Sequence, residues 1–561
     1  MNKQIKVNTK LSKYVYKPLK ILLLTFLVLF ISLLVYVHFK SQIPSPEVPE
    51  IKIGKRIKVS DNYYVLGNNY LKKNNFGIWE MYIEGSPYER GLVYGELAKE
   101  LIQYQEEVFV DQIKSFVPSR IWQKTLRLII GFFNSELPKH IPLENQQEIY
   151  GISKCFSDEF DFIAPKYTRI LNYHAAHDIG HALNDYSLVG CTSFSLKGSK
   201  TTDKNIIIGR NFDFYVSDAF AKDKMIVFVN PTSGYKFSSY SWAGFTGVAS
   251  GLNEKGLSVT INASKSDLPL GSRMPISLLA REILQYASTT EEAIKIAEKR
   301  HTFVSETLMI GSAIDGKTIL IEKSPTKMNV YESKSDQLIC TNHYQGDLFK
   351  KDPVNIKNIQ ESDSKLRYAR VSELINKESV LDVNKAAGIL RDQYAENEDS
   401  LGIGNPRAIN QLNGHHSVII IPQKKLFYIS TFDFQLGPYV CYDLSATFTT
   451  RKAQITDSIN ADPFLLSQAY KGYKEFRRIK QEINKFLILN NPLSLNSQEI
   501  NYFISLNAES YLSYETIGRY FYKKEDFNNA SKYFKLALSK RVASPKVESE
   551  IKLLLQNCSR R

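Results

Sequence analysis

One apolar stretch near the start of the sequence places the strongest constraint on the fold. Residues Leu19–Val37 read LKILLLTFLVLFISLLVYV and carry a single charge, that of Lys20, at their edge. A helix of this length crosses a hydrocarbon core of about 30 Å, because each helical residue rises about 1.5 Å. The stretch has no polar face, which argues against a buried core helix. We therefore expect residues 19–39 to form a transmembrane helix.

The residues on either side of this stretch predict its orientation. Six lysines lie at or before its first turn, and Lys40 is the basic residue that follows it closely; the six are Lys3, Lys6, Lys10, Lys13, Lys17 and Lys20. The positive-inside rule then puts residues 1–18 in the cytoplasm and the body outside it, in a single-pass membrane protein. A cleaved signal peptide is the competing interpretation. The apolar run is long for a signal core, however, and no small-x-small cleavage site follows it.

Composition excludes several other classes of protein. The chain has 561 residues, 43% hydrophobic and 23% charged, which suits several globular domains rather than a disordered chain. The net charge of +14 is spread along the chain and partly concentrated at its ends, so we expect a membrane surface and no nucleic acid as partner. Five cysteines lie far apart with no Cys-x-x-Cys pair, and neither a zinc site nor a disulfide framework is expected.

Hydrophobic patterning divides the rest of the chain. Residues 40–76 include three prolines in a mixed-charge segment and are predicted to be a stalk, with globular sequence from about Gly77. Helical patterns cover residues 94–110, 122–133, 276–286, 290–299 and 364–376. Short strands are expected at CTSFSL, NIIIGRNFDF, MIVFVN, GVASGL, LSVTIN, TILIEK, HSVIIIP and KLFYIS. Strands in adjoining pairs with helices between them predict stacked α and β layers.

Beyond about Arg451 the strand pattern stops, and residues 451–561 are predicted to be helical. Their spacing matches one tetratricopeptide repeat at Tyr514, Ile517, Gly518, Phe521, Ala530, Phe534 and Ala537, with Pro545 a few residues late. One repeat cannot bury its own faces, so it must pack on neighbouring helices or on the main domain. A structural cap is therefore favoured, and a protein partner at these helices is the alternative.

The chemistry is concentrated in residues 188–214, LVGCTSFSLKGSKTTDKNIIIGRNFDF. Cys191 follows Gly190, and Arg210 and Asp213 come 19 and 22 positions later. A cysteine beside a glycine is by itself more often packing than catalysis. A hairpin, however, would return both charged residues to the start of the first strand. There the arginine would favour the thiolate, and the aspartate would hold a nearby amine or the substrate's nitrogen.

These residues resemble the N-terminal nucleophile (Ntn) hydrolases, in particular the penicillin acyltransferase-type branch of peptidase family C45, related to choloylglycine hydrolases and penicillin V acylases. Cys191-Thr192 matches the family's Cys-Thr start, and GRNFDF matches its Gly-Arg-Asn segment. Five further stretches between about residues 77 and 450 resemble family elements: GSPYERGLVYGELAKEL (85–101), GLNEKGLSVTIN (251–262), TNH (341–343), SKLRYAR (364–370) and HSVIIIPQKKLFYIS (416–430).

The resemblance implies an α+β fold with a four-layer αββα sandwich, a propeptide-like part at 77–190 and a catalytic part at 191–450. It implies that the chain cuts itself between Gly190 and Cys191, which frees Cys191 as the nucleophile. Besides Arg210 and Asp213, it implies oxyanion roles for Asn262 and Asn342. It also implies a late catalytic arginine at Arg367, with Arg370 as runner-up. No cofactor is implied.

Elementary chemistry is consistent with this interpretation. A thiol of ordinary pKa near 8.5 needs a base, and a free α-amino group with a pKa of about 7.7–8.0 provides one on the same residue. Asn262 and Asn342 would stabilise the oxyanion, each such donor typically contributing about 3 kcal/mol. The expected activity is hydrolysis or acyl transfer at a linear amide of a small N-acyl substrate through a Cys191 thioester. The acyl group, and whether water or an amine accepts it, stay open.

Three alternatives remain. The spacing of His174, His177 and His181 would allow a metal on one helix face, although these residues precede the expected cut. A cysteine hydrolase could pair Cys191 with His343, His415 or His416, but would give Arg210 and Asp213 no role. The third alternative is an inactive Ntn scaffold whose C-terminal helices bind a partner.

Overall fold

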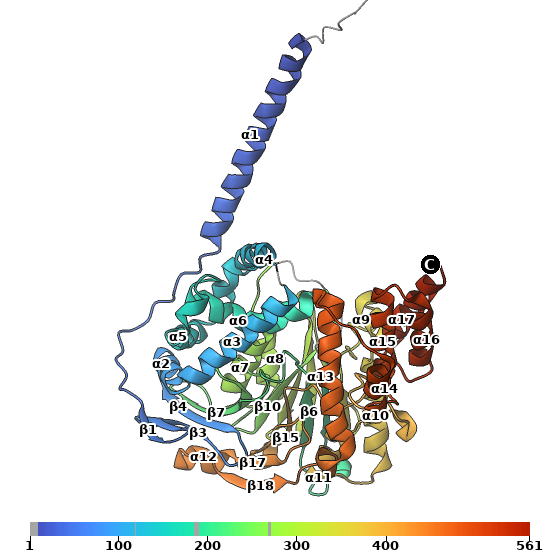
Figure 1. Cartoon of the computed structure of the whole chain (residues 1–561). Helices are drawn as coiled ribbons and strands as arrows, with labels where there is room; N and C mark the ends of the chain where they lie inside the picture. Colours follow the sequence, from blue (N-terminus) through green and yellow to red (C-terminus); the bar gives the residue numbers. More distant parts are fainter. Residues whose placement is uncertain (1–8, 118, 184–189, 268–270, 561) are drawn as a thin grey trace, which may run out of the picture.

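The computed structural model describes residues 9–117, 119–183, 190–267 and 271–560. A long helix, α1 (Thr9–Lys40), projects away from the body, as Figure 1 shows. Its segment Leu19–Val37 has a mean hydropathy of 2.6 and is 0% buried, so it is long and apolar enough to cross a membrane. A signal sequence near the start of a chain meets the same criteria. An extended segment then leads from α1 to the first strand.

Two stacked β-sheets form the centre of the body. Within the described ranges, the larger sheet has eleven strands; in spatial order they are β1 (Ile57–Ser60), β2 (Tyr63–Leu66), β3 (Asn69–Lys73), β4 (Trp79–Gly85), β7 (Lys224–Pro231), β8 (Phe237–Trp242), β9 (Ser250–Asn253), β10 (Leu257–Ala263), β11 (Glu306–Ser312), β12 (Lys317–Lys323) and β13 (Met328–Tyr331). The smaller has seven: β14 (Gln337–Cys340), β5 (Thr192–Leu196), β6 (Ile207–Phe212), β15 (His416–Ile421), β16 (Leu426–Ser430), β17 (Tyr439–Asp443) and β18 (Ile455–Ile459). Neighbours pair antiparallel except β4 and β7, which are parallel.

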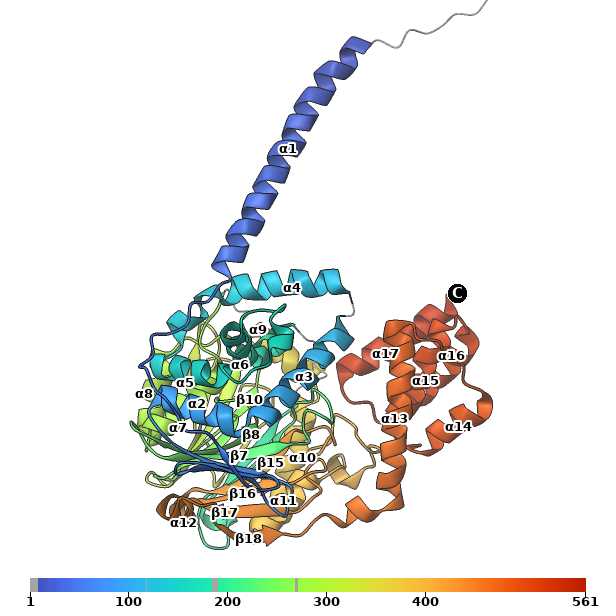
Figure 2. The ribbon, with the colours of Figure 1, turned by 60° about the vertical axis from the view of Figure 1, so that its left-hand side comes forward.

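Helices cover both outer faces, so the body has four layers in the order α, β, β, α. The larger sheet is covered by α2 (Pro87–Leu97), α3 (Lys99–Phe116), α5 (Leu143–Ser153), α6 (Lys166–Leu183), α7 (Ile276–Tyr286) and α8 (Thr290–Lys299), and α4 (Arg120–Phe133) lies at the foot of α1 (Figure 2). After α9 (Pro353–Glu361), the helices α10 (Ser364–Lys377) and α11 (Val383–Arg391) cover the smaller sheet. The short helix α12 (Leu444–Thr450) follows β17.

The alternating directions of side chains along each strand explain these layers. Successive side chains of a strand point to opposite faces. Ile208 accordingly packs between the two sheets, in one core with Phe228 and Met309. Its neighbour Ile207 packs on the other face, in the core that contains Val371 of α10. Both faces of this strand are thus buried, and the start of the neighbouring strand β5 lies deep within the molecule.

The predicted elements are confirmed in large part. Helices α7 and α8 have the expected bounds, α10 runs one residue further, and each of the eight predicted strand sequences overlaps an observed strand. The helix expected over residues 94–110 is instead two helices that meet at Ala98.

Two boundaries differ from the sequence prediction. Residues 57–73 belong to the larger sheet rather than to a stalk, because they form hairpins that bury Leu66 and Leu71. Strand β18 extends the smaller sheet past Arg451, where we expected strands to stop.

The C-terminal helices α13 (Gln468–Leu489), α14 (Ser497–Ser505), α15 (Tyr511–Lys523), α16 (Phe527–Leu538) and α17 (Pro545–Ser559) form a block beside the body (Figure 2). Phe476 and Phe503 of this block pack with Leu412 and Phe434 from loops of the body. Helices α15 and α16 pack closely, since a Cβ on Gly518 would lie 2.6 Å from Cδ1 of Phe534. The block therefore packs on the main domain as expected, and its likeness to a tetratricopeptide repeat stays a prediction.

Candidate active site

Cys191 lies immediately before β5, where the pairing of β5 with β6 sets its surroundings. Thr192 pairs with Asn211, so the cysteine lies opposite the end of β6. The Cys191 side chain is 1% exposed, and Nη2 of Arg210 lies 3.7 Å from its Sγ. The amide nitrogen of Gly190 donates to the carbonyl oxygen of Asp213 at 3.2 Å. The hairpin thus brings Cys191, Arg210 and Asp213 together, as the spacing predicted.

Burial controls the protonation of the Cys191 thiol. It raises the pKa of Cys191 to about 11, with the Arg210 charge acting in the opposite direction and the Asp213 charge in the same one. The side chain is therefore a neutral thiol at pH 7 in this uncut chain. Any reaction through this sulfur needs a group that removes its proton.

Asp213 is a buried carboxyl without a partner. It is 1% exposed, and neither carboxylate oxygen has a hydrogen-bond partner in the described structure. Burial raises the pKa of Asp213 to about 7, although Arg367 and Arg210 lower it. A group with this pKa exchanges a proton near neutral pH, and its anion would be stabilised by any cation placed beside it.

Arg210 is held rigidly. Its Nη1 donates to Oγ of Ser250 at 2.8 Å, and its Nη2 donates to the carbonyl oxygen of Ile261. The aromatic ring of Phe212 lies under the guanidinium, 4.1 Å from Cζ to the ring centroid. The arginine is 0% exposed, so its charge acts on Cys191 with little screening by solvent.

Of the other predicted residues, Arg367 contacts the backbone of Cys191, Asn342 contacts Arg367, and Asn262 accepts from Oγ of Ser193, two residues after the cysteine. Nη1 of Arg367 donates to the carbonyl oxygen of Cys191 at 2.7 Å, and its Nη2 donates to Oδ1 of Asn342 at 2.6 Å. Nδ2 of Asn342 donates to the carbonyl oxygen of Ala263 at 2.9 Å. Nδ2 of Asn262 contacts two backbone carbonyl oxygens, at 3.1 and 3.4 Å. The runner-up Arg370 instead pairs with Asp392 at 2.8 Å, which favours Arg367 for a role at the site.

Sequence reasoning missed one residue at the expected cleavage point. Nε2 of Gln411 donates to the carbonyl oxygen of Gly190 at 3.2 Å, from 221 positions further along the chain. The contact is close, because a Cβ on residue 190 would lie 2.4 Å from this nitrogen. Gln411 comes from the irregular segment between α11 and β15, whose residue Ile409 accepts a hydrogen bond from Asn211 at 3.0 Å. Such a loop contact leaves no periodic signal in the sequence.

The histidine alternatives find little support. Among the described residues, His343, His415 and His416 make no hydrogen bond to Cys191: His343 contacts Ser364, and His415 contacts His416. His174 is buried with both ring nitrogens engaged, by the carbonyl oxygen of Ile170 at 2.8 Å and by Thr246 at 2.9 Å. The side chains of residues 177 and 181 lie outside the described part. No group of three or more metal-ligating side chains occurs among the residues described.

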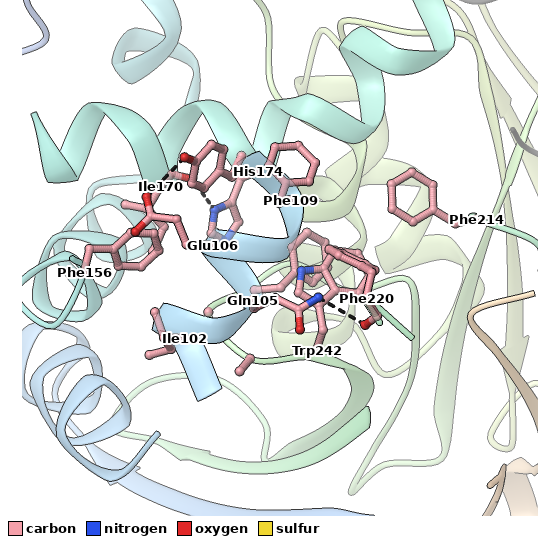
Figure 3. Close-up of a pocket in the computed structure, with 14 residues that line it drawn as sticks. Ile102, Gln105, Glu106, Phe109, Phe156, Ile170, His174, Phe214, Phe220 and Trp242 are labelled. Atoms are coloured by element: carbon pink, nitrogen blue, oxygen red, sulfur yellow. Dashed lines mark hydrogen bonds between the residues drawn. The ribbon is translucent and has the colours of Figure 1, made fainter. Parts of the chain in front are cut away.

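An apolar cavity of about 50 Å³ lies near the site (Figure 3). One side comes from the segment that precedes Cys191, with Phe109 of α3 and His174 of α6. The other side comes from residues that follow it, including Phe214 and Trp242, whose rings stack at 5.8 Å. The ring of Phe214 stacks on that of Phe212 with 5.6 Å between centroids, and Phe212 lies under Arg210, so this cavity is close to the candidate site.

A buried cysteine beside an arginine and an unpaired aspartate, at the start of a strand between stacked sheets, is the arrangement expected of an Ntn hydrolase. The profile of the family described as acyl-coenzyme A:6-aminopenicillanic acid acyl-transferase matches residues 199–401. This match confirms the predicted resemblance to that family over this segment. The matched segment includes Arg210, Asp213 and Arg367 but begins after Cys191.

Individual proteins also match this chain. The chain is 24% identical over 315 residues to an uncharacterized protein of Archaeoglobus fulgidus, a match that covers 49% of this chain and 51% of the other. It is 22% identical over 268 residues to the N-acylethanolamine-hydrolyzing acid amidase of Caenorhabditis elegans, covering 46% of this chain and 70% of the amidase. The chain thus spans about half the length of the archaeal relative.

Two solved structures overlap part of the fold. The Caenorhabditis elegans N-acylethanolamine-hydrolyzing acid amidase ortholog has 18% sequence identity and a TM-score of 0.30, over 42% of this chain and 93% of that one. A mutant of the conjugated bile acid hydrolase from Clostridium perfringens has 17% identity and a TM-score of 0.32, over 48% of this chain and 98% of that one.

Proposed function

We propose that the chain is a self-processing amidohydrolase or acyltransferase that acts on a small N-acyl amide through a thioester on Cys191. The observation that carries the proposal is the buried, unpartnered carboxylate of Asp213 beside a buried cysteine whose thiol contacts Arg210. Cleavage before Cys191 would create an α-ammonium group, which is the cation that this carboxylate lacks.

In the self-cleavage step, the proton of the Cys191 thiol passes to Asp213, and Sγ attacks the carbonyl carbon of Gly190. Nε2 of Gln411, 3.2 Å from that oxygen, donates to the developing oxyanion. The C–N bond then breaks, the proton moves to the leaving amine, and a thioester joins residue 190 to Sγ. Water hydrolyses the thioester, which frees the thiol and leaves a carboxylate on Gly190.

The same sulfur then serves the substrate. The α-amine of Cys191 takes the thiol proton, and Arg210 stabilises the thiolate. Among the described residues, Nδ2 of Asn342 has a single acceptor, so its second N–H is available to the oxyanion. Asn262 is already shared between two carbonyl groups and is the weaker of the two donors. Arg367 holds both Asn342 and the cysteine backbone in place.

The apolar cavity near Phe214 would receive the first carbons of the acyl half, since each buried methylene contributes about 0.8 kcal/mol. At about 50 Å³ it holds only a small group, so a longer acyl chain must extend beyond it. Its walls come from both sides of the proposed cut, so both products of cleavage must stay together. The test is amine release from a panel of N-acyl amino acids, bile-salt conjugates and β-lactams, with Cys191→Ala as control. Release that persists in Cys191→Ala would contradict the proposal.

We also propose that α1 anchors the body to a membrane, with residues 41–561 outside the cytoplasm. Helix α4 supports this proposal, because it exposes Ile121 and Trp122, 78% and 62% exposed. It lies at the foot of α1, where the rings of Tyr36 and Phe132 are 6.3 Å apart. An amphipathic helix in this place would lie in the membrane interface. Protease added to spheroplasts should digest the body, and full protection would contradict the orientation.

A further inference from the structure

A second, larger cavity of about 530 Å³ separates the catalytic body from the C-terminal helices. Gly190 forms part of its wall, so the cavity opens beside the proposed cleavage point. The body contributes Tyr215 and Asp363 to the lining. Helix α13 contributes Arg477, Lys480 and Asn484, whose spacing places them on one helix face. The C-terminal block, which the family profile does not cover, therefore builds one side of a cavity at the active site.

Arg477 ties this helix face to the catalytic segment. Its two Nη atoms donate to the carboxylate of Asp218 at 2.7 and 2.9 Å, and Nη2 also donates to Oη of Tyr215 at 3.0 Å. Both partners lie a few residues after Asp213. The charge of Arg477 is thus neutralised by Asp218, and its function in the cavity wall is to fix α13 in place.

Lys480 lies one turn further along α13, and no carboxylate pairs with it in the described part of the chain. It is half-buried and makes no hydrogen bond or ion pair with any residue in the described ranges. Burial lowers the pKa of Lys480, with the charge of Glu515 opposing this. Glu515 itself is paired with Arg519.

The acidic groups of the lining do not neutralise Lys480 either. Asp363 is paired with Arg367 at 3.4 Å, and Glu361 lies 4.0 Å from Lys357. Glu550 is exposed on α17. A half-buried ammonium group without a counter-ion is unfavourable, and an anion that enters the cavity would relieve this cost.

We propose that this cavity binds the amine half of the amide substrate and that Lys480 binds a carboxylate on it. The inference rests on the proposed function, because it places the acyl half at Cys191 and the remaining half beyond Gly190. It narrows the substrate class to N-acyl amino acids. The C-terminal block then determines specificity, through a residue outside the region that matches the family.

Two amides that share one acyl chain test the proposal: N-dodecanoylglycine, which has a carboxylate, and N-dodecanoylethanolamine, which has none. Lys480→Met should raise KM for the glycine conjugate about tenfold or more, the scale of a lost charge-assisted hydrogen bond. KM for the ethanolamide should stay within about twofold, and Lys480→Arg should retain most of the glycine preference. Lys471→Met is the matched control, since Lys471 is exposed on the same helix and does not line the cavity.

An equal change in KM for both amides, or no change for either, would overturn the proposal, as would wild-type protein that cleaves the ethanolamide alone. If wild-type protein cleaves neither amide, the panel of other amides decides the proposed function, and calorimetric titration of N-dodecanoylglycine tests the site by itself. A weaker Kd in Lys480→Met than in wild type would support the site. Equal Kd values, or no binding to either, would contradict it.

Discussion

The two regions that flank the catalytic part are joined to it in opposite ways. Residues 57–85 supply β1–β4 to the larger sheet, with β4 parallel to β7, and the helices that follow share its apolar core. The C-terminal helices have an apolar core of their own, which meets the body at loop residues such as Leu412 and Phe434. Residues 57–85 are thus an integral part of the sandwich, whereas the C-terminal helices are a separate block that packs against it.

An ion-pair triad offers the strongest test of this difference. Glu148 of α5 pairs with Arg90 and with Arg281 of α7, each at 2.7 Å, and all three side chains are 1–2% exposed. Glu148→Leu would leave two buried guanidinium groups uncompensated, so we expect the free energy of unfolding to fall by about 3–5 kcal/mol. Arg477→Met breaks a pair whose side chains are 18% and 45% exposed and should cost about 1 kcal/mol or less. Denaturant unfolding would measure both, and equal losses would contradict the comparison.

The same triad predicts an acid dependence. Burial raises the pKa of Glu148, but Arg281 and Arg90 outweigh it and hold that pKa at about 2. A carboxyl with a lowered folded-state pKa contributes stability above its unfolded pKa of about 4.3 and loses it as the pH falls. The stability difference between wild type and Glu148→Gln should therefore shrink between about pH 4.3 and 2. A constant difference over this interval, measured by urea unfolding, would exclude a charged Glu148.

Asp213→Asn should have the next largest effect, at the proposed catalytic site between these two regions of the sequence. The substitution keeps the shape of the side chain and removes its charge. We therefore expect a folded protein whose activity falls by about 100-fold or more. Because the pKa of Asp213 is raised to about 7, self-cleavage in wild type should speed up as the pH rises through 7. Cleavage kinetics and amine release would measure both effects. Wild-type rates in the variant would show that Asp213 is only structural.

Gln411→Leu should have a smaller effect, which is confined to the rate of self-cleavage. Loss of its hydrogen bond to the Gly190 oxygen should slow self-cleavage about tenfold, with little change in activity once the chain is cut. Gln423→Leu is the control, since Oε1 of Gln423 accepts from the amide of Ile206, away from Gly190. The fraction of cut chain over time on a denaturing gel gives the rate. Equal rates in the two variants would remove Gln411 from the mechanism.

What the sequence could predict follows from how local each feature is. Cys191, Arg210 and Asp213 lie on one hairpin, so their spacing alone brings them together. The positions of Asn262, Asn342 and Arg367 came from the family resemblance. In the structure Arg367 contacts Cys191, and the two asparagines contact its neighbours Arg367 and Ser193. Gln411 contacts Gly190 from a loop, and Lys480 lines the neighbouring cavity from a helix outside the family match. Both positions depend on tertiary packing and leave no pattern in the sequence.

The stalk prediction failed for a related reason. Residues 57–60 read IKVS and alternate between apolar and polar side chains, but the run is only four residues long and forms an exposed edge strand. Pairing with β2 places them in the sheet, and that pairing cannot be seen in the segment itself.

The most direct test of the account is the N-terminal sequence of the larger fragment from active, purified protein. Self-cleavage predicts two chains, residues 1–190 and 191–561, which stay together under native conditions and separate in denaturant. The larger one should begin Cys-Thr-Ser-Phe. Cys191→Ala should remain a single inactive chain, and Cys191→Ser should be cut slowly, since a hydroxyl is the poorer nucleophile. An active preparation that contains only the intact chain, with no cysteine at any N-terminus, would contradict the mechanism.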